Sequence, residues 1–293
     1  MATLGIIGSG QIGSTLARLA VEAGHDVVLS NSRGPETLAD TVAALGPRAT
    51  AATSAQAAAA GDLVVVTVPV AAFSHLPTEA LAGKTVIDTC NYGPGRDGHV
   101  AALDDKSLTS SELLHQRLGD VTVVKAFNNI FYKHLLSLGR PSGAVDRSYL
   151  PIAGDSGLAK AEVAAFIDSI GYGVVDAGPL ADSWSQETGA PVWGTPYGSY
   201  SNDNGHPAGE ESIRLALAAA THGSHRTTVL GGAGRPRCGV AARSVEMIAR
   251  CPERLVGSQW RGVADAQAEH SASGKPRSPN ATNAGLRGPP ATQ

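Results

Sequence analysis

The sequence predicts an α/β fold built on a doubly wound, mostly parallel sheet. A glycine-rich turn, from Gly8 to Gly13, joins a short apolar run to an alanine- and leucine-rich segment. Residues 63–70 form a nearly continuous β-branched run, which is typical of a strand buried on both faces. Strand-like and helix-like segments then alternate as far as residue 178. Together these features indicate a Rossmann-type sheet with helices on both faces.

The turn at the start of the chain has the spacing G-x-G-x-x-G. Gly8 would permit a tight turn, Gly10 would let the backbone approach a pyrophosphate, and Gly13 would let the helix lie close to the strand. The alternative is that the three glycines only make a packing turn. We expect a dinucleotide to be bound by Gly8, Ser9, Gly10, Gln11, Ile12 and Gly13.

The end of the second predicted strand, residues 25–30, indicates which dinucleotide is bound. Enzymes that prefer NAD usually have Asp or Glu at this place, to hydrogen-bond the ribose hydroxyls. This chain has Asn31, Ser32 and Arg33 instead, and a guanidinium with neutral donors suits the 2′-phosphate of NADP. The alternative is an ordinary arginine on a solvated loop.

The remaining elements follow in the order of a doubly wound sheet. Helices are expected at 35–45, 76–81, from Ser110 and at 158–170, and strands at 84–91, 121–129, 150–155 and 173–178. Val68 and Pro69 end the strand at 63–70. Because open α/β sheets bind ligands at the carboxyl ends of their strands, we expect these two residues to contact the nicotinamide.

A polar cluster at the end of strand 121–129 supplies the candidate catalytic side chains Lys125, Asn128 and Asn129. The asparagines could hydrogen-bond the acceptor or the nicotinamide carboxamide, and Lys125 could stabilise negative charge. Alternatively the asparagines cap the next helix, 131–138, and Lys125 is structural. Ser110 and Ser111 are expected to be N-caps, Cys90 a small core residue, and His134 a surface residue.

Five stretches together resemble one family, the NADP oxidoreductases dependent on coenzyme F420, a 5-deazaflavin, and among them the actinobacterial branch. They are the glycine turn, Asn31-Ser-Arg-Gly-Pro-Glu-Thr-Leu, Val124-Lys-Ala-Phe-Asn-Asn-Ile, Ile152-Ala-Gly-Asp and Ala177-Gly-Pro-Leu-Ala-Asp-Ser-Trp. The resemblance covers about residues 4–220. It implies NADP as cofactor and F420 as co-substrate, with Ser32 and Arg33 at the 2′-phosphate and Asn128-Asn129-Ile130 beside the second ligand.

The same resemblance implies a domain plan. Residues 1–180 would form the NADP-binding Rossmann domain, and residues 181–222 a small C-terminal α/β cap over the acceptor. The sequence departs from the family after Trp184, where an arginine is expected, at Trp193, where a tyrosine is expected, and in a long insert at 197–209. Trp184 and Trp193 could close over a planar ligand or simply pack under this insert.

The predicted activity is that of an NADPH:F420 reductase, an oxidoreductase that needs no prominent general acid. The chain has no Tyr-x-x-x-Lys pair. Two alternatives stay open. One is an NADPH-dependent reductase of a small carbonyl or imine substrate, and the other is a non-catalytic NADP-binding sensor.

Composition bounds the remaining expectations. Three cysteines without CxxC spacing and scattered histidines indicate neither disulfides nor a metal site, and no apolar run reaches membrane-spanning length. We expect a cytoplasmic protein whose partner is a small-molecule hydride acceptor, with no nucleic acid or membrane partner. The resemblance implies a homodimer. Residues 223–293, which carry ten Lys or Arg and four Asp or Glu, are expected to be a disordered basic tail.

Overall fold

The computed structural model describes residues 1–221, and the predicted basic tail at 223–293 lies outside the described residues. Eight strands form one sheet in the order β3-β2-β1-β4-β5-β6-β7-β8. All neighbours pair in parallel except β6 and β7, which are antiparallel. The strands are β1 (Thr3–Ile7), β2 (Asp26–Ser30), β3 (Ala49–Ala51), β4 (Leu63–Val66), β5 (Thr85–Asp88), β6 (Thr122–Lys125), β7 (Tyr149–Gly154) and β8 (Gly173–Asp176).

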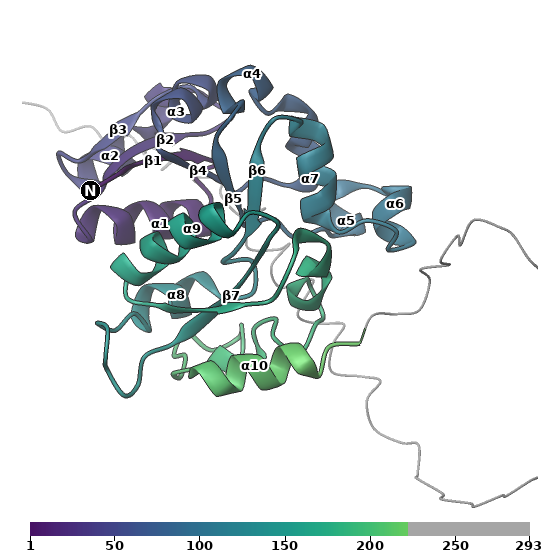
Figure 1. The fold of residues 1–293 in the computed structure, drawn as a ribbon. Coiled ribbons are helices and arrows are strands. Elements are labelled where there is room, and N and C mark those ends of the chain that lie inside the picture. The colour runs from purple at the N-terminus through teal and green to yellow at the C-terminus, as the bar shows by residue number, and fades with distance from the viewer. Residues whose placement is uncertain (222–293) are drawn as a thin grey trace, which may run out of the picture. The chain divides into compact units, whose positions relative to one another are not determined.

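Helices connect the strands and cover both faces of the sheet (Figure 1). The longer ones are α1 (Gln11–Glu22), α2 (Ala39–Leu45), α3 (Ser54–Ala60), α7 (Ser110–Leu118), α9 (Gly157–Ser169) and α10 (Glu210–Ala218). The short ones are α4 (Thr78–Leu81), α5 (Pro94–Asp97), α6 (Ala101–Asp104) and α8 (Tyr132–Ser137), with 3₁₀ turns η1 (Pro35–Leu38), η2 (Val70–His75), η3 (Leu180–Gln186) and η4 (Thr195–Tyr197). The predicted doubly wound α/β fold is confirmed.

The central strands are apolar on both faces because each face is covered. Along β4, Leu63 and Val65 join a core with α1 and α9, whereas Val64 and Val66 join a second core with α3 and α7. Successive residues of a strand point to opposite faces, so a continuous apolar run is what a doubly covered strand requires. This explains why the run at 63–66 shows no alternation.

The segment after β8 packs against the sheet through α10, which contacts β7 and β8 (Figure 1). Side chains from the strand ends also hold it. Asn128 Nδ2 donates to the carbonyl oxygen of Gln186 (2.6 Å), and Asn129 Nδ2 donates to that of Val192 (3.1 Å). The C-terminal segment is therefore attached at the carboxyl edge of the sheet, where ligands bind in open α/β folds.

Two local expectations are wrong. Thr109, and not Ser110 or Ser111, is the N-cap of α7, because its hydroxyl accepts the N–H of Glu112 in a capping box. His134, expected at the surface, is fully buried under the 197–209 insert, with Nε2 2.8 Å from the carbonyl oxygen of Asn202. The insert itself provides the cover that the local sequence did not reveal.

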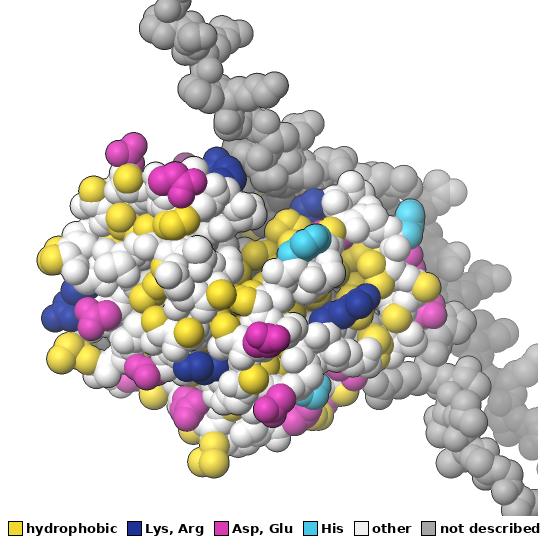
Figure 2. Space-filling view, turned by 90° about the horizontal axis from the view of Figure 1, so that it is seen from above, with side chains coloured by type: hydrophobic (Ala, Val, Ile, Leu, Met, Phe, Trp, Pro, Cys, Tyr) yellow, Lys and Arg dark blue, Asp and Glu magenta, His cyan; other side chains and the backbone are white. Residues whose placement is uncertain are grey.

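On the face drawn in Figure 2, charges of both signs are interspersed with neutral and hydrophobic side chains. Within residues 1–221, no helix is long and apolar enough to cross a membrane.

Candidate functional site

The first turn of the sheet, between β1 and α1, has the geometry predicted for Gly8. Its φ of +116° is a backbone conformation that residues with a Cβ rarely adopt. A Cβ placed there would lie 2.2 Å from the carbonyl oxygen of Thr67, at the end of β4. The Gly8 N–H donates to the carbonyl oxygen of Ser30 at 3.0 Å. Gly8 is thus wedged between the ends of β2 and β4.

Gly10 and Gly13 differ in what surrounds them. A Cβ on Gly13 would lie 2.0 Å from the Gly8 carbonyl oxygen, so glycine is needed for α1 to pack on the turn. A Cβ on Gly10 would meet nothing within 4 Å, and no side chain caps the N-terminus of α1. Helix N-terminal N–H groups attract anions. The open space above Gly10 therefore fits a pyrophosphate, and the residues present fit a dinucleotide.

The other residues of the turn frame this space. Gln11 is exposed, Ser9 and Ile12 are half-buried, and the Ser9 carbonyl oxygen accepts the Ser14 hydroxyl at 3.0 Å. Ser9 and Gln11 therefore border the space, while Ile12 packs against the core.

The loop after β2 is ordered by Asn31 and presents the two residues that follow it. The Oδ1 atom of Asn31 accepts the N–H groups of Arg33 and Gly34, each at 3.0 Å, and Nδ2 donates to Thr37 Oγ1 at 2.9 Å. Ser32 and Arg33 are exposed. Within residues 1–221 the Arg33 guanidinium has no ion-pair partner, and so it is free to bind an anion.

Val68 and Pro69 come directly after β4, where Val68 is half-buried and Pro69 is exposed. Because β1 lies between β2 and β4 and all three are parallel, their carboxyl ends are adjacent. The structure therefore brings together the glycine turn, the 31–33 loop and Val68-Pro69, as the sequence predicted.

The two asparagines after β6 are used within the protein. Asn128 is 5% exposed and Asn129 is fully buried. Besides its bond to Gln186, Asn128 Nδ2 donates to Asn91 Oδ1 at 3.0 Å, and the N–H of Gly194 donates to the Asn129 carbonyl oxygen at 2.8 Å. The alternative that the asparagines cap α8 is wrong, because the N-cap of α8 is Phe131, with no side-chain cap. Among the described residues, both Oδ1 atoms are buried without a partner.

Lys125 lies in a buried polar network. Its ammonium is 3.1 Å from Asp88 Oδ2 on β5 and 3.0 Å from the Ser110 hydroxyl, and it also donates to the Cys90 carbonyl oxygen. Ser111 donates to the same Asp88 oxygen at 2.7 Å. Lys125 and Asp88 are fully buried. This geometry favours the structural interpretation of Lys125, because its charge is already compensated.

The network continues to the half-buried Glu187 and to Cys90, just after the carboxyl end of β5. The Ser110 N–H and hydroxyl both donate to Glu187 Oε1, each at 2.7 Å, and the Cys90 N–H donates to Asp88 Oδ1 at 2.8 Å. Burial, followed by the nearby negative charge of Asp88, raises the pKa of the Cys90 thiol well above its ordinary value. Cys90 is thus a buried, neutral thiol, as expected.

Phe127, at the carboxyl edge of the sheet, has an unusual backbone conformation that the sequence did not reveal. It sits directly before the two asparagines with φ +62°, a rare conformation for a residue with a bulky side chain. Its ring is fully buried and meets Phe166 edge-on. The resulting kink lets the chain turn from β6 into the Asn128-Asn129 corner.

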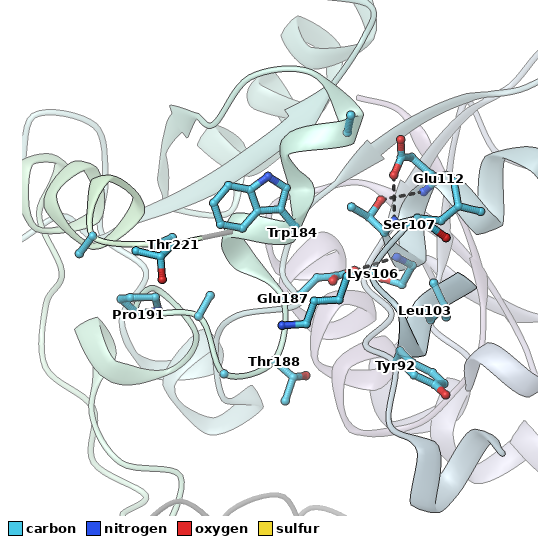
Figure 3. A pocket seen from close by; sticks show the side chains of 18 residues that line it. Tyr92, Leu103, Lys106, Ser107, Glu112, Trp184, Glu187, Thr188, Pro191 and Thr221 are labelled. Carbon is cyan, nitrogen blue, oxygen red and sulfur yellow. Dashed lines mark hydrogen bonds between the residues drawn. The ribbon is translucent and has the colours of Figure 1, made fainter. Parts of the chain in front are cut away.

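A cavity of about 540 Å³ opens beside this corner (Figure 3). One wall is formed by the loop and helix between β5 and β6, the other by η3 and the segment that follows it. Its lining includes Tyr92, Lys106, Ser110, Trp184 and Glu187. It includes part of the 181–222 segment predicted to cover the acceptor, but none of the residues predicted to bind NADP and neither Asn128 nor Asn129. The volume of the cavity is typical of pockets that bind small-molecule ligands.

The two tryptophans have different surroundings. Trp184 is half-buried and lines this cavity, whereas Trp193 is 4% exposed and stacks on Tyr200 of the insert, with ring centroids 4.7 Å apart. Trp193 thus packs under the insert. Within residues 1–221, no three His, Cys, Asp or Glu side chains are placed to hold a metal ion.

The arrangement as a whole can bind a dinucleotide at the carboxyl edge of β1, β2 and β4, with room for a second molecule beyond β5. Comparison with known proteins gives the class. Residues 3–92 match the family described as NADP oxidoreductase, coenzyme F420-dependent. The fold and this match define an NADP-type oxidoreductase with a Rossmann domain.

Two solved structures are similar over most of their length. The hypothetical protein SMa0349 from Sinorhizobium meliloti is 30% identical, with a TM-score of 0.58, over 66% of this chain and 93% of that one. The chain belongs to the same family as this protein. A candidate F420-dependent NADP reductase from Arthrobacter sp. FB24 is 24% identical, with a TM-score of 0.51, over 61% of this chain and 86% of that one, which is a likeness of fold. No curated protein matches the chain.

Proposed function

We propose that the protein transfers a hydride between NADPH and coenzyme F420. The observation that carries the NADP half is the open, uncapped helix N-terminus at Gly10 next to the free guanidinium of Arg33. The deazaflavin half is supported by the family match over residues 3–92. The overall reaction converts NADPH, a proton and oxidised F420 into NADP⁺ and reduced F420.

The roles of the NADP-site residues follow from their positions. The N–H groups at the start of α1 would bind the pyrophosphate, which needs both the open space at Gly10 and the close packing at Gly13. Ser32 and Arg33 would bind the 2′-phosphate with charge-assisted hydrogen bonds. Val68 and Pro69 would form the wall against which the nicotinamide lies. Asn31 orders the 31–33 loop and would contribute to NADP binding mainly through it.

When bound, the dihydronicotinamide supplies the hydride, and the deazaflavin ring accepts it together with a proton. The task of the protein is then to hold two flat rings in register and to exclude water. We propose that residues 1–180 bind NADP and that residues 181–222 cover the acceptor. Attachment of this segment at Asn128 and Asn129 supports that division, because it places the segment at the carboxyl edge. We further propose that the protein is cytoplasmic and forms a homodimer. The resemblance supports the dimer, and light scattering of the full chain tests it.

Mixing the protein with NADPH and oxidised F420 tests the proposal. The visible absorbance of the deazaflavin should fall as NADPH is oxidised. If the absorbance of F420 does not change at any pH from about 5 to 9, the proposed activity is refuted. Oxidation of NADPH by a small carbonyl or imine alone would favour that reductase instead, and binding of NADPH without oxidation by any acceptor would favour a sensor.

A further inference from the structure

The cavity beside Trp184 is next to the predicted nicotinamide wall. The Cys90 thiol donates to the Val66 carbonyl oxygen at 3.5 Å, at the end of the strand that leads to Val68. Tyr92, two residues further along, lines the cavity. Two residues of chain span at most about 7 Å. The segment from Cys90 to Tyr92 therefore contacts the end of β4 through its first residue and the cavity through its last, so only this short segment separates the two.

The cavity has an aromatic wall and one free cation among its described lining residues. Figure 3 shows the Trp184 indole on one side and the Lys106 side chain reaching in between Trp184 and Thr188. The backbone of Lys106 has φ +58°, which is uncommon for a residue with a side chain. Within residues 1–221 the Lys106 ammonium has no ion-pair partner.

The two carboxylates that line the cavity are bound to N–H groups at the start of α7. Glu187 accepts the N–H and hydroxyl of Ser110, and Glu112 accepts the N–H of Thr109 at 2.8 Å. Carboxylates are stabilised at a helix N-terminus, where they compensate its partial positive charge. The charge of Lys106 is thus the one that remains available to a ligand.

We propose that this cavity is the acceptor site, in which Trp184 contacts the flat deazaflavin ring and Lys106 pairs with the anionic chain attached to it. The inference rests on the proposed function and moves the acceptor away from residues 128–130. Those side chains are 5%, 0% and 3% exposed and hold the C-terminal segment in place. The volume of about 540 Å³ suffices for a tricyclic ring and part of its chain.

Two ligands distinguish the proposed role of Trp184, which contacts the ring, from that of Lys106, which pairs with the anionic chain. Coenzyme F420 carries the phosphate- and carboxylate-bearing chain, and the deazaflavin with only its ribitol lacks it. Each is titrated by calorimetry into the protein saturated with NADP⁺. Trp184→Ala should weaken both ligands by about tenfold, and Trp184→Phe should restore most of this loss. Lys106→Gln should weaken F420 by about three- to tenfold and leave the ribitol compound unchanged.

The control is Arg48→Gln, which removes an exposed cation before β3, at the opposite edge of the sheet, and should change neither affinity. Thermal unfolding checks that each variant is folded. If Trp184→Ala does not fold, the result for Lys106→Gln decides the test. If the protein reduces F420 but Trp184→Phe, Trp184→Ala and Lys106→Gln all bind it as the parent does, the cavity is not the acceptor site and the proposed function stands. If the parent neither binds nor reduces F420, both fall.

Discussion

The ammonium of Lys125 lies 3.1 Å from the carboxylate of Asp88, and neither side chain is exposed to solvent. The pair joins neighbouring strands β5 and β6 at their carboxyl ends, and Ser110 and Ser111 connect it to α7. Through Ser110 the same network reaches Glu187 in the C-terminal segment. The pair and its network therefore hold together β5, β6, α7 and the C-terminal segment, of which α7 and the C-terminal segment line the proposed acceptor cavity.

Replacement of Lys125 by methionine should be strongly destabilising. It would leave the Asp88 carboxylate buried without its counter-ion, which typically costs about 3–5 kcal/mol of the free energy of unfolding. Urea denaturation followed by circular dichroism measures this cost. Arg48→Gln, which breaks the exposed pair with Asp26, is the control and should change stability little. Equal effects of the two substitutions would refute the structural role of Lys125.

The glycine turn predicts opposite outcomes for two alanine substitutions. Gly13→Ala places a Cβ 2.0 Å from the Gly8 carbonyl oxygen and should lower stability by about 1–3 kcal/mol through overpacking. Gly10→Ala meets no protein atom within 4 Å, so the protein should fold normally. Its methyl group would occupy the proposed pyrophosphate space, and the Kd for NADPH should rise by about tenfold or more. Unchanged NADPH binding by Gly10→Ala would contradict the proposed cradle.

Arg33→Ala should reduce the preference for NADPH over NADH. Loss of the charge-assisted bonds to the 2′-phosphate should narrow the gap between the two binding free energies by about 1.5–3 kcal/mol. Calorimetric titration with each nucleotide measures this gap. Arg48→Ala is the matched control, because Arg48 precedes β3 at the amino ends of the strands, whereas Arg33 follows the carboxyl end of β2. If the parent protein binds both nucleotides equally, the assignment of the 31–33 loop to NADP is wrong.

The Cys90 thiol should resist alkylation in the native protein. Burial keeps it protonated at pH values where an unfolded thiol, with an ordinary pKa of about 8.5, is half ionised. Iodoacetamide at that pH followed by peptide mass spectrometry should leave the Cys90 peptide unmodified until urea is added. The unfolded state loses the proton first, so the free energy of unfolding should fall as the pH rises above this value. Rapid native labelling of this peptide would be the contrary result.

The parts of the structure that follow from local rules could be predicted from sequence. Glycine is required at position 13 by a contact with Gly8, five residues away, and at position 8 by the positive φ of the turn, although the atom nearest to a Cβ there belongs to the distant Thr67. The meeting of the 8–13, 31–33 and 68–69 segments follows from parallel strand order. The uninterrupted apolar run of β4 likewise follows from burial on both faces.

Contacts between distant segments could not be predicted in this way. The partner of Lys125 is 37 residues away, and Asn128 bonds to a carbonyl 58 residues later. Polar side chains at the end of a strand therefore suggested a ligand site in the sequence. In the structure these side chains instead bind other segments of the chain. Trp184 and Trp193 gave the same signal in sequence, and only the fold separates the one that lines the cavity from the one that packs under the insert. Nothing in the sequence marked Lys106.

The most direct test of direct hydride transfer uses NADPH deuterated at C4 of the nicotinamide, on each face in turn, with oxidised F420 in ordinary water. If the hydride passes directly between the two rings, one of the two isotopomers transfers its deuterium, and mass spectrometry finds reduced F420 heavier by one mass unit. Reduced F420 without deuterium from either isotopomer, or no reduced F420 at all, would contradict direct transfer.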